Sequence, residues 1–218
     1  MLIKLMLAIA CVISIHLLTM AFCAGLLGIT VRMITFGVGP HILAFGRVHV
    51  SLIPAGGKVR VAMLADAPEG TYLTGTLDGA ARWKQVLLPL SGPLALFGVG
   101  ILFLGGPAVE QFIHAFPQIL GGALSPLNKA QAHLHDASNT LRALSTMQVL
   151  GIAACKVAAF NLLPFLGSNG LAAATAWLPQ TTRDGNVMKR FQSLFILPCT
   201  YLLLASWFLA IAVFLFSL

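Results

Sequence analysis

The sequence predicts a membrane α-helical fold, and its composition and its apolar segments carry that prediction. Of the 218 residues, 58% are hydrophobic and only 9% are charged, whereas a typical soluble domain has about 25% charged residues. The mean hydropathy is +0.93. Four apolar segments are each about as long as the roughly 20 residues that a helix needs to cross a bilayer. We therefore expect a single membrane domain over residues 1–218, with four transmembrane helices.

The predicted spans cover residues 2–31, 85–105, 144–165 and 191–216. The first span starts beside Lys4 in the manner of a signal peptide. Its apolar run is longer than the 7–15 residues of a signal-peptide core. We therefore expect a retained transmembrane helix.

Two segments between the spans have a different character. Residues 35–63 are punctuated by Gly and Pro, and β-branched residues partly alternate in them, which is typical of short strands joined by turns. In residues 107–142, prolines and glycines interrupt an apolar stretch that precedes a polar one. We expect an interfacial, extracytoplasmic segment there, ending in a short amphipathic helix over residues 130–144.

The Lys and Arg residues are divided unevenly between the two sides of the predicted membrane domain. Nine lie in the loops between spans one and two and between spans three and four, and three lie on the opposite side. Because cytoplasmic loops carry the excess of positive charge, we expect both termini outside and the strand region in the cytoplasm, with a bacterial inner membrane as the location. The net charge of +7 is then a property of loops, and we expect no nucleic-acid partner.

The first predicted span contains half of a metal-binding pattern. His16 and Met20 are four residues apart, so they project from one face of a helix. H-E-x-x-H presents two zinc ligands and a base at this spacing. Here Leu17 stands in place of the Glu and Met20 in place of the second His. The four Cys residues lie in or beside apolar runs without a close pair and do not suggest a Cys-based zinc framework.

Four blocks of sequence carry a resemblance to a known family. They are His16-Leu-Leu-Thr-Met20, Phe36-Gly-Val-Gly39 with Ser51–Val59 (SLIPAGGKV), Ser91-Gly-Pro-Leu-Ala-Leu96, and Asn161–Gly170 (NLLPFLGSNG). In this order they resemble the site-2 protease family of intramembrane zinc metalloproteases. The resemblance covers nearly the whole chain, and it implies a membrane-associated β-hairpin between the first two transmembrane helices. The PDZ domains that many members insert after the second span are absent.

The departures from the family pattern fall on its chemistry. The resemblance implies zinc ligands at positions 16, 20 and 169, and a catalytic Glu at position 17. These positions hold His16, Met20, Asn169 and Leu17, while Leu96 replaces an Asn of the second-helix motif. A thioether is a poor Zn²⁺ ligand and Leu cannot act as a base. We therefore expect a degenerate member with no catalytic residues and no cofactor.

The resemblance also implies a use that does not require zinc. Members open a groove between helices for a client segment, and their β-hairpin adds a strand to it through backbone groups. We expect this chain to bind a transmembrane or membrane-adjacent client without cleaving it, as a structural subunit, assembly factor or regulator of a membrane complex. The candidate client-binding residues are Ser51, Leu52, Ile53, Pro54, Gly56, Gly57, Asn161, Pro164, Asn169 and Gly170.

Two other functions remain open from the sequence. An atypical protease could hold zinc through His16 and groups from outside the motif, which would make zinc its cofactor. A transporter or channel component has less support, because the chain has no inverted repeat and few charges within its spans.

Two polar residues within the spans have alternative interpretations. His16 is either a buried histidine hydrogen-bonded to Asn161 or Asn169, or a ligand that pairs with Met20 on copper or haem iron. Lys156 lies inside the third span, where charges are costly and are functional candidates. It either extends to the membrane surface or lies nearer a helix end than the predicted span places it. In our hypothesis it instead bonds Asn169 or a carbonyl in the cavity that would hold zinc.

Overall fold

The computed structural model describes residues 2–66, 74–178 and 186–217, and this part of the chain is mostly helical with one small antiparallel sheet. Arg183, one of the basic residues counted above, lies outside the described residues. The helices are α1 (Leu2–Leu26), α2 (Arg82–Leu104), α3 (Pro107–Leu124), α4 (Lys129–Ala143), α5 (Thr146–Leu162), α6 (Asn169–Trp177), α8 (Asn186–Phe191) and α9 (Leu197–Phe216). The strands are β1 (Val31–Phe45) and β2 (Val48–Val61).

Three of the four predicted spans coincide with helices long and apolar enough to cross a bilayer. They cover Ile3–Leu26, Arg82–Leu104 and Val187–Phe216. The last of them includes a π-helical segment at Gln192–Ile196. The third predicted span forms α5, which has 17 residues and is about 25 Å long. That is shorter than the roughly 30 Å hydrocarbon core, so the described helices support three spans rather than four.

Helices α1, α2 and α5 enclose the core of the protein. Val12 of α1, Leu96 of α2 and Ala154 and Ala158 of α5 form one cluster and are fully buried. The small alanine side chains allow the helix backbones to approach closely, as is typical of helix packing in membranes. Leu96 therefore fills an apolar space at the position where the family motif has an Asn.

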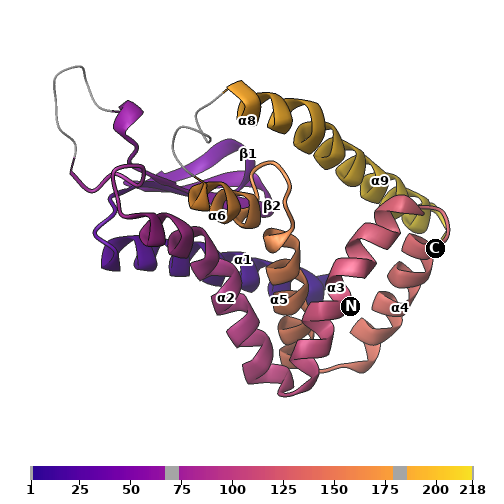
Figure 1. Cartoon of the computed structure of the whole chain (residues 1–218). Coiled ribbons are helices and arrows are strands. Elements are labelled where there is room, and N and C mark those ends of the chain that lie inside the picture. Colours follow the sequence, from indigo (N-terminus) through magenta and orange to yellow (C-terminus); the bar gives the residue numbers. More distant parts are fainter. Residues whose placement is uncertain (1, 67–73, 179–185, 218) are drawn as a thin grey trace.

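The two strands form a sheet that is bent back on itself. Ile34 of β1 pairs with Val48 at the start of β2 and with Val59 near its end. Because a strand has only two edges, the first half of β1 lies between these two segments of β2. The hairpin predicted between the first two spans is present, and Figure 1 shows it lying over α1.

The segment after α2 differs from the prediction. The sequence predicted a segment broken by prolines and glycines, but residues Pro107–Leu124 form one continuous helix, α3. Pro107 occupies the first helical position, where a missing N–H costs nothing. Gly122 lies under the ring of Trp207 in α9, whose Nε1 donates to the carbonyl of Ile119 at 2.9 Å. The glycine is therefore a packing site between α3 and α9 rather than a break.

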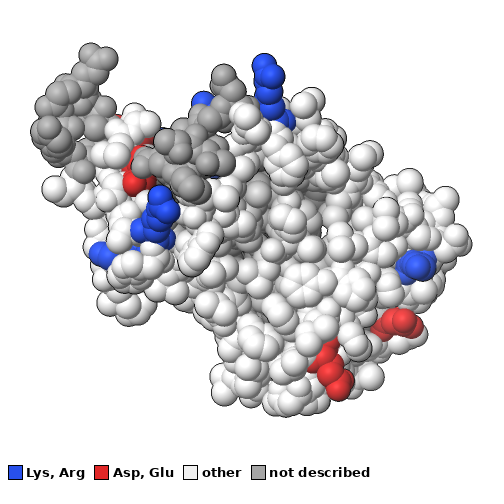
Figure 2. All heavy atoms as spheres, viewed as in Figure 1, with Lys and Arg blue, Asp and Glu red and all other residues white. Residues whose placement is uncertain are grey.

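On the face drawn in Figure 2, the charged residues are few and a broad area without charged side chains lies between them. In the view of Figure 1, α9 lies beside α3 and α4, away from the sheet. Its exposed large side chains include Leu202, Phe208 and Phe216, which are 70%, 71% and 94% exposed. Such a surface is unfavourable in water and suits contact with lipid.

Candidate functional site

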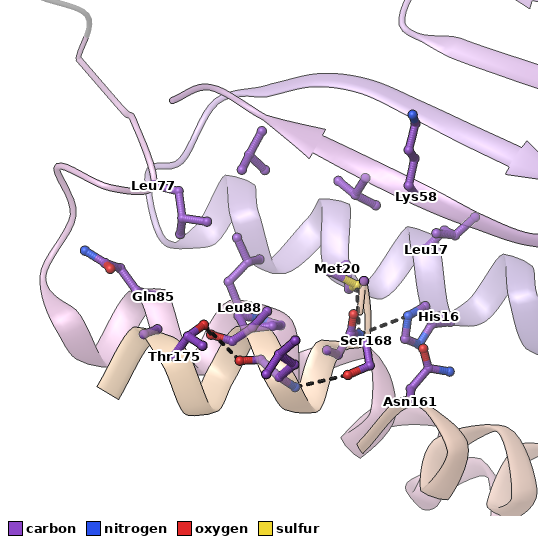
Figure 3. A pocket seen from close by; sticks show the side chains of 18 of the residues that line it. His16, Leu17, Met20, Lys58, Leu77, Gln85, Leu88, Asn161, Ser168 and Thr175 are labelled. Carbon is purple, nitrogen blue, oxygen red and sulfur yellow. Dashed lines mark hydrogen bonds between the residues drawn. The ribbon is translucent and has the colours of Figure 1, made fainter. Parts of the chain in front are cut away.

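Residues from three of the motif blocks, His16–Met20, Ser51–Val59 and Asn161–Gly170, meet around one pocket of about 600 Å³. Its walls come from α1, the end of β2, the start of α2, and α6. Figure 3 shows His16, Leu17 and Met20 on one helix, below the strand that carries Lys58, with Asn161 and Ser168 approaching from the other side. Segments far apart in the chain therefore build a single cavity.

Helix α1 presents His16 and Leu17 to different neighbours. The His16 ring lies against Gly92 of α2, where an added Cβ would be 2.6 Å from ring atoms Nδ1 and Cε1. Leu17, at the position of the family's catalytic Glu, is 1% exposed and packs under Gly57 of β2. The side chain that replaces the base is thus part of the packing between helix and sheet.

The loop after α5 places Asn169 at the pocket. Gly167 has a φ of +83°, which glycine adopts without strain and which reverses the chain. Ser168 then caps α6 by accepting a hydrogen bond from the backbone N–H of Leu171 at 3.1 Å. Gly170 lies so close to the carbonyl of Leu162 that a Cβ would overlap it. Together these residues fix the first turn of α6 against the end of α5.

One amide joins the three positions that would hold zinc in the family. Asn169 Nδ2 lies 3.1 Å from His16 Nε2 and 3.4 Å from Met20 Sδ. A thioether sulfur can only accept a hydrogen bond, so the amide nitrogen, with its two hydrogens, suits both neighbours. For His16 Nε2 to accept this hydrogen bond, the ring must be the tautomer with its proton on Nδ1. The predicted bond between His16 and Asn169 is present.

These side chains do not fit a zinc ion. The three positions offer one imidazole, one thioether and an amide whose nitrogen, not its oxygen, faces the other two. Structural and catalytic zinc sites are built from thiolates, imidazoles and carboxylates. Within the described residues, no three His, Cys, Asp or Glu side chains gather where they could hold a metal.

The structure brings only some of the predicted client-binding residues to the pocket. Gly57, Asn161 and Asn169 line it. Ser51 instead is buried within the sheet, and Leu52 and Ile53 are 60% and 53% exposed on the hairpin. Gly56, Pro164 and Gly170 lie outside the lining, and the side chain of Pro54 is outside the described part of the chain.

The hypothesis for Lys156 is wrong. Its ammonium donates to Gln118 Oε1 of α3 and it does not line the pocket. Asn169 bonds His16 and Met20 instead, and Asn161 donates to the carbonyl of Val157 in its own helix at 2.9 Å. On α5, Lys156 therefore faces the contact with α3, whereas the pocket lies at the last turn of the helix, where Asn161 lines it.

Sequence reasoning missed several parts of the pocket. Helix α6 was not predicted, although Ser168 followed by Asn169 and Gly170 has the polar start typical of a capped helix. Gln85 and Gln192 also line the cavity. Gln85 is a polar residue at the edge of a predicted span and donates to the carbonyl of Ala80 at 2.8 Å. Gly92 was recognised only as part of the Ser91–Leu96 block, and its contact with the His16 ring was not predicted.

Apolar helices around a pocket, with a hairpin over one of them, define a membrane protein. The family model of peptidase family M50 matches residues 4–197. The chain therefore belongs to peptidase family M50, the site-2 protease family. No curated protein matches the chain.

Proposed function

We propose that this protein is a pseudoprotease, which binds a transmembrane or membrane-adjacent client in the pocket and does not cleave it. The hydrogen-bonded group of His16, Met20 and Asn169 carries the proposal. An amide donor occupies the place where the family's chemistry needs an anionic ligand. The residue at the position of the base, Leu17, is an aliphatic side chain buried under the sheet.

The end of β2 is the client-binding element that this geometry favours. Gly57, Lys58, Val59 and Val61 line the pocket, and they pair on one side with the first half of β1. No strand pairs with their other edge among the described residues. An extended client could add itself there through backbone hydrogen bonds, which require no metal. This narrows the proposed contact within Ser51–Val59 to its end and extends it to Val61.

The proposed setting is a bacterial inner membrane, with both termini outside and the hairpin in the cytoplasm. The uneven division of Lys and Arg residues between the loops supports this orientation. In this membrane the protein would act as a structural subunit, an assembly factor or a regulator of a membrane complex.

Crosslinking in the native membrane tests the client-binding surface. A photoreactive residue replaces Val59, which lines the pocket, and in a matched variant it replaces Leu43, which is 51% exposed on the hairpin. We expect a full-length membrane protein to be captured from position 59 and not from position 43. Equal capture from both positions, or capture of cleaved fragments, would contradict the proposal.

A further inference from the structure

Two polar atoms within the sheet are buried without a hydrogen-bond partner among the described residues. They are Thr35 Oγ1 and His49 Nδ1. Buried polar side-chain atoms are nearly always paired, so each exception calls for a specific explanation, such as an ion or an ordered water. Thr35 and His49 are also direct partners in the strand register, which places their Cβ atoms about 4.5–5.5 Å apart.

A second histidine lies beside this pair. His41 is the register partner of Ser51, and Ser51 follows His49 by two residues and so shares its face of the strand. The rings of His41 and His49 are 4.9 Å apart between centroids and inclined by 60°. Four polar side chains from three strand segments, those of Thr35, His41, His49 and Ser51, therefore gather in one place.

The ring separation agrees with two imidazoles on one metal ion. With metal–nitrogen bonds of about 2.0–2.1 Å and near-tetrahedral angles, two coordinating rings have centroids about 5 Å apart. His41 Nδ1 lies 3.2 Å from Ser51 Oγ, which leaves Nε2 to coordinate. Metal-binding histidines usually use their second nitrogen in such an orienting bond. Ser51 is 3% exposed, so its hydroxyl is held in place by its surroundings.

We propose that His41 and His49 form a binding site for one divalent transition-metal ion of the kind that imidazole prefers, namely Zn²⁺, Cu²⁺ or Ni²⁺. Ser51 orients His41, the Thr35 hydroxyl lies opposite His49, and water completes the coordination. The site is distinct from the pocket, because none of these four residues lines it. His41 is exposed, so an ion can enter from the surface, and its binding joins the return segment of β1 to the start of β2.

Copper binding to the full-length protein in detergent tests the site. Cu²⁺ is added to the purified chain, and electron paramagnetic resonance reports nitrogen ligands while titration reports the affinity. Removal of an orienting partner alone costs about 10–100-fold in affinity, so Ser51→Ala should weaken binding within that range. His41→Ala and His49→Ala each remove a ligand and should weaken it by at least about 100-fold.

Two matched controls separate this site from other histidines. His16→Ala alters the pocket and His133→Ala alters α4, and both should bind Cu²⁺ as the unchanged chain does. Ni²⁺ should also raise the unfolding temperature of the unchanged protein but not that of His41→Ala, a surface variant expected to fold. Unchanged affinity in His41→Ala, or a lack of nitrogen-ligated copper in the unchanged chain, would overturn the proposal and leave a buried water as the partner of the two orphan atoms.

Discussion

Asn169 links α1 to α6 through a single amide group. Its Nδ2 donates to His16 Nε2, and the His16 side chain is only 9% exposed. Asn169→Ala would leave this nitrogen buried without its partner, which costs about 1–3 kcal/mol. We expect a corresponding fall in the unfolding free energy in detergent micelles.

Asn161→Ala is the matched control for that measurement. Asn161 also lines the pocket, but its amide bonds a carbonyl within its own helix. Removing such a local bond should cost about 1 kcal/mol or less. Equal losses of stability in the two variants would show that the bond between Asn169 and His16 does not join the helices.

The sequence was informative about His16 and misleading about Lys156. A buried histidine in an apolar helix needs a hydrogen-bond partner, and the motif that contains Asn169 supplied the candidate. For Lys156 the sequence showed only a charge inside an apolar helix. The direction in which that side chain points depends on how α5 is rotated against α3 and on the presence of Gln118. The residues next to Lys156 in the sequence predict neither of these.

At the scale of elements, the contact between β2 and α1 depends on a glycine. A Cβ at Gly57 would lie 2.5 Å from Leu17 Cδ1 and would overlap the carbonyl of Thr35. Gly57→Ala should therefore destabilise the protein by about 1–3 kcal/mol, the usual cost of overpacking. Thermal unfolding and capture of the client from position 59 should both be reduced.

Gly98→Ala is the control for the glycine prediction. Gly98 lies within α2, and nothing stands within 4 Å of an added Cβ there. Alanine favours a helix over glycine by up to about 1 kcal/mol, so this variant should be neutral or slightly more stable. If Gly57→Ala unfolds like Gly98→Ala, the sheet does not pack on α1 as described.

The turn after β2 should respond to acid. Asp66 accepts a hydrogen bond from the backbone N–H of Met63 at 3.2 Å and pairs with Arg60 and Arg32 at 3.2 and 3.7 Å. The Met63 N–H, followed by the two guanidinium groups, lowers the pKa of Asp66 below its usual value of 3.8.

The sign of the pH effect follows from that lowered pKa. The carboxylate stabilises the turn fully above the unfolded pKa, and the contribution is lost as the pH falls through the lower folded value. Hydrogen exchange at the Met63 amide, whose hydrogen bond Asp66 accepts, should therefore quicken below about pH 4, relative to the intrinsic rate. Asp66→Asn should show that faster relative exchange already at neutral pH, and an unchanged profile in the variant would refute the assignment.

The length of the apolar runs identified the long helices, and this criterion failed for helices whose position depends on packing. The ranges of α1, α2 and α9 were approximately predicted because each is an apolar run of membrane length. In α3, glycines and prolines suggested a break, yet Gly122 makes room for Trp207. In α6, nine residues are too few for a clear period, and its position depends on the contact of Gly170 with α5.

At the scale of the whole molecule, a fold of peptidase family M50 surrounds a pocket whose motif positions hold His16, Leu17, Met20 and Asn169. Order and spacing of the motifs predicted that they would meet, because a family fold constrains all of them at once. The shape of the pocket was not predictable from the sequence, since α6 and the end of β2 bound it and their placement is set by tertiary contacts. Whether this pocket holds zinc therefore distinguishes a pseudoprotease from a zinc protease.

Zinc analysis of the purified full-length chain tests that claim most directly. The unchanged protein is compared with His16→Ala, with His41→Ala to identify any zinc bound at the hairpin, and with a triple variant, Leu17→Glu, Met20→His and Asn169→Asp, that restores the family's groups. We predict no zinc that depends on His16 in the unchanged chain, and about one additional zinc per chain in the triple variant. One zinc per unchanged chain that His16→Ala removes, together with cleavage of a membrane substrate, would contradict the account.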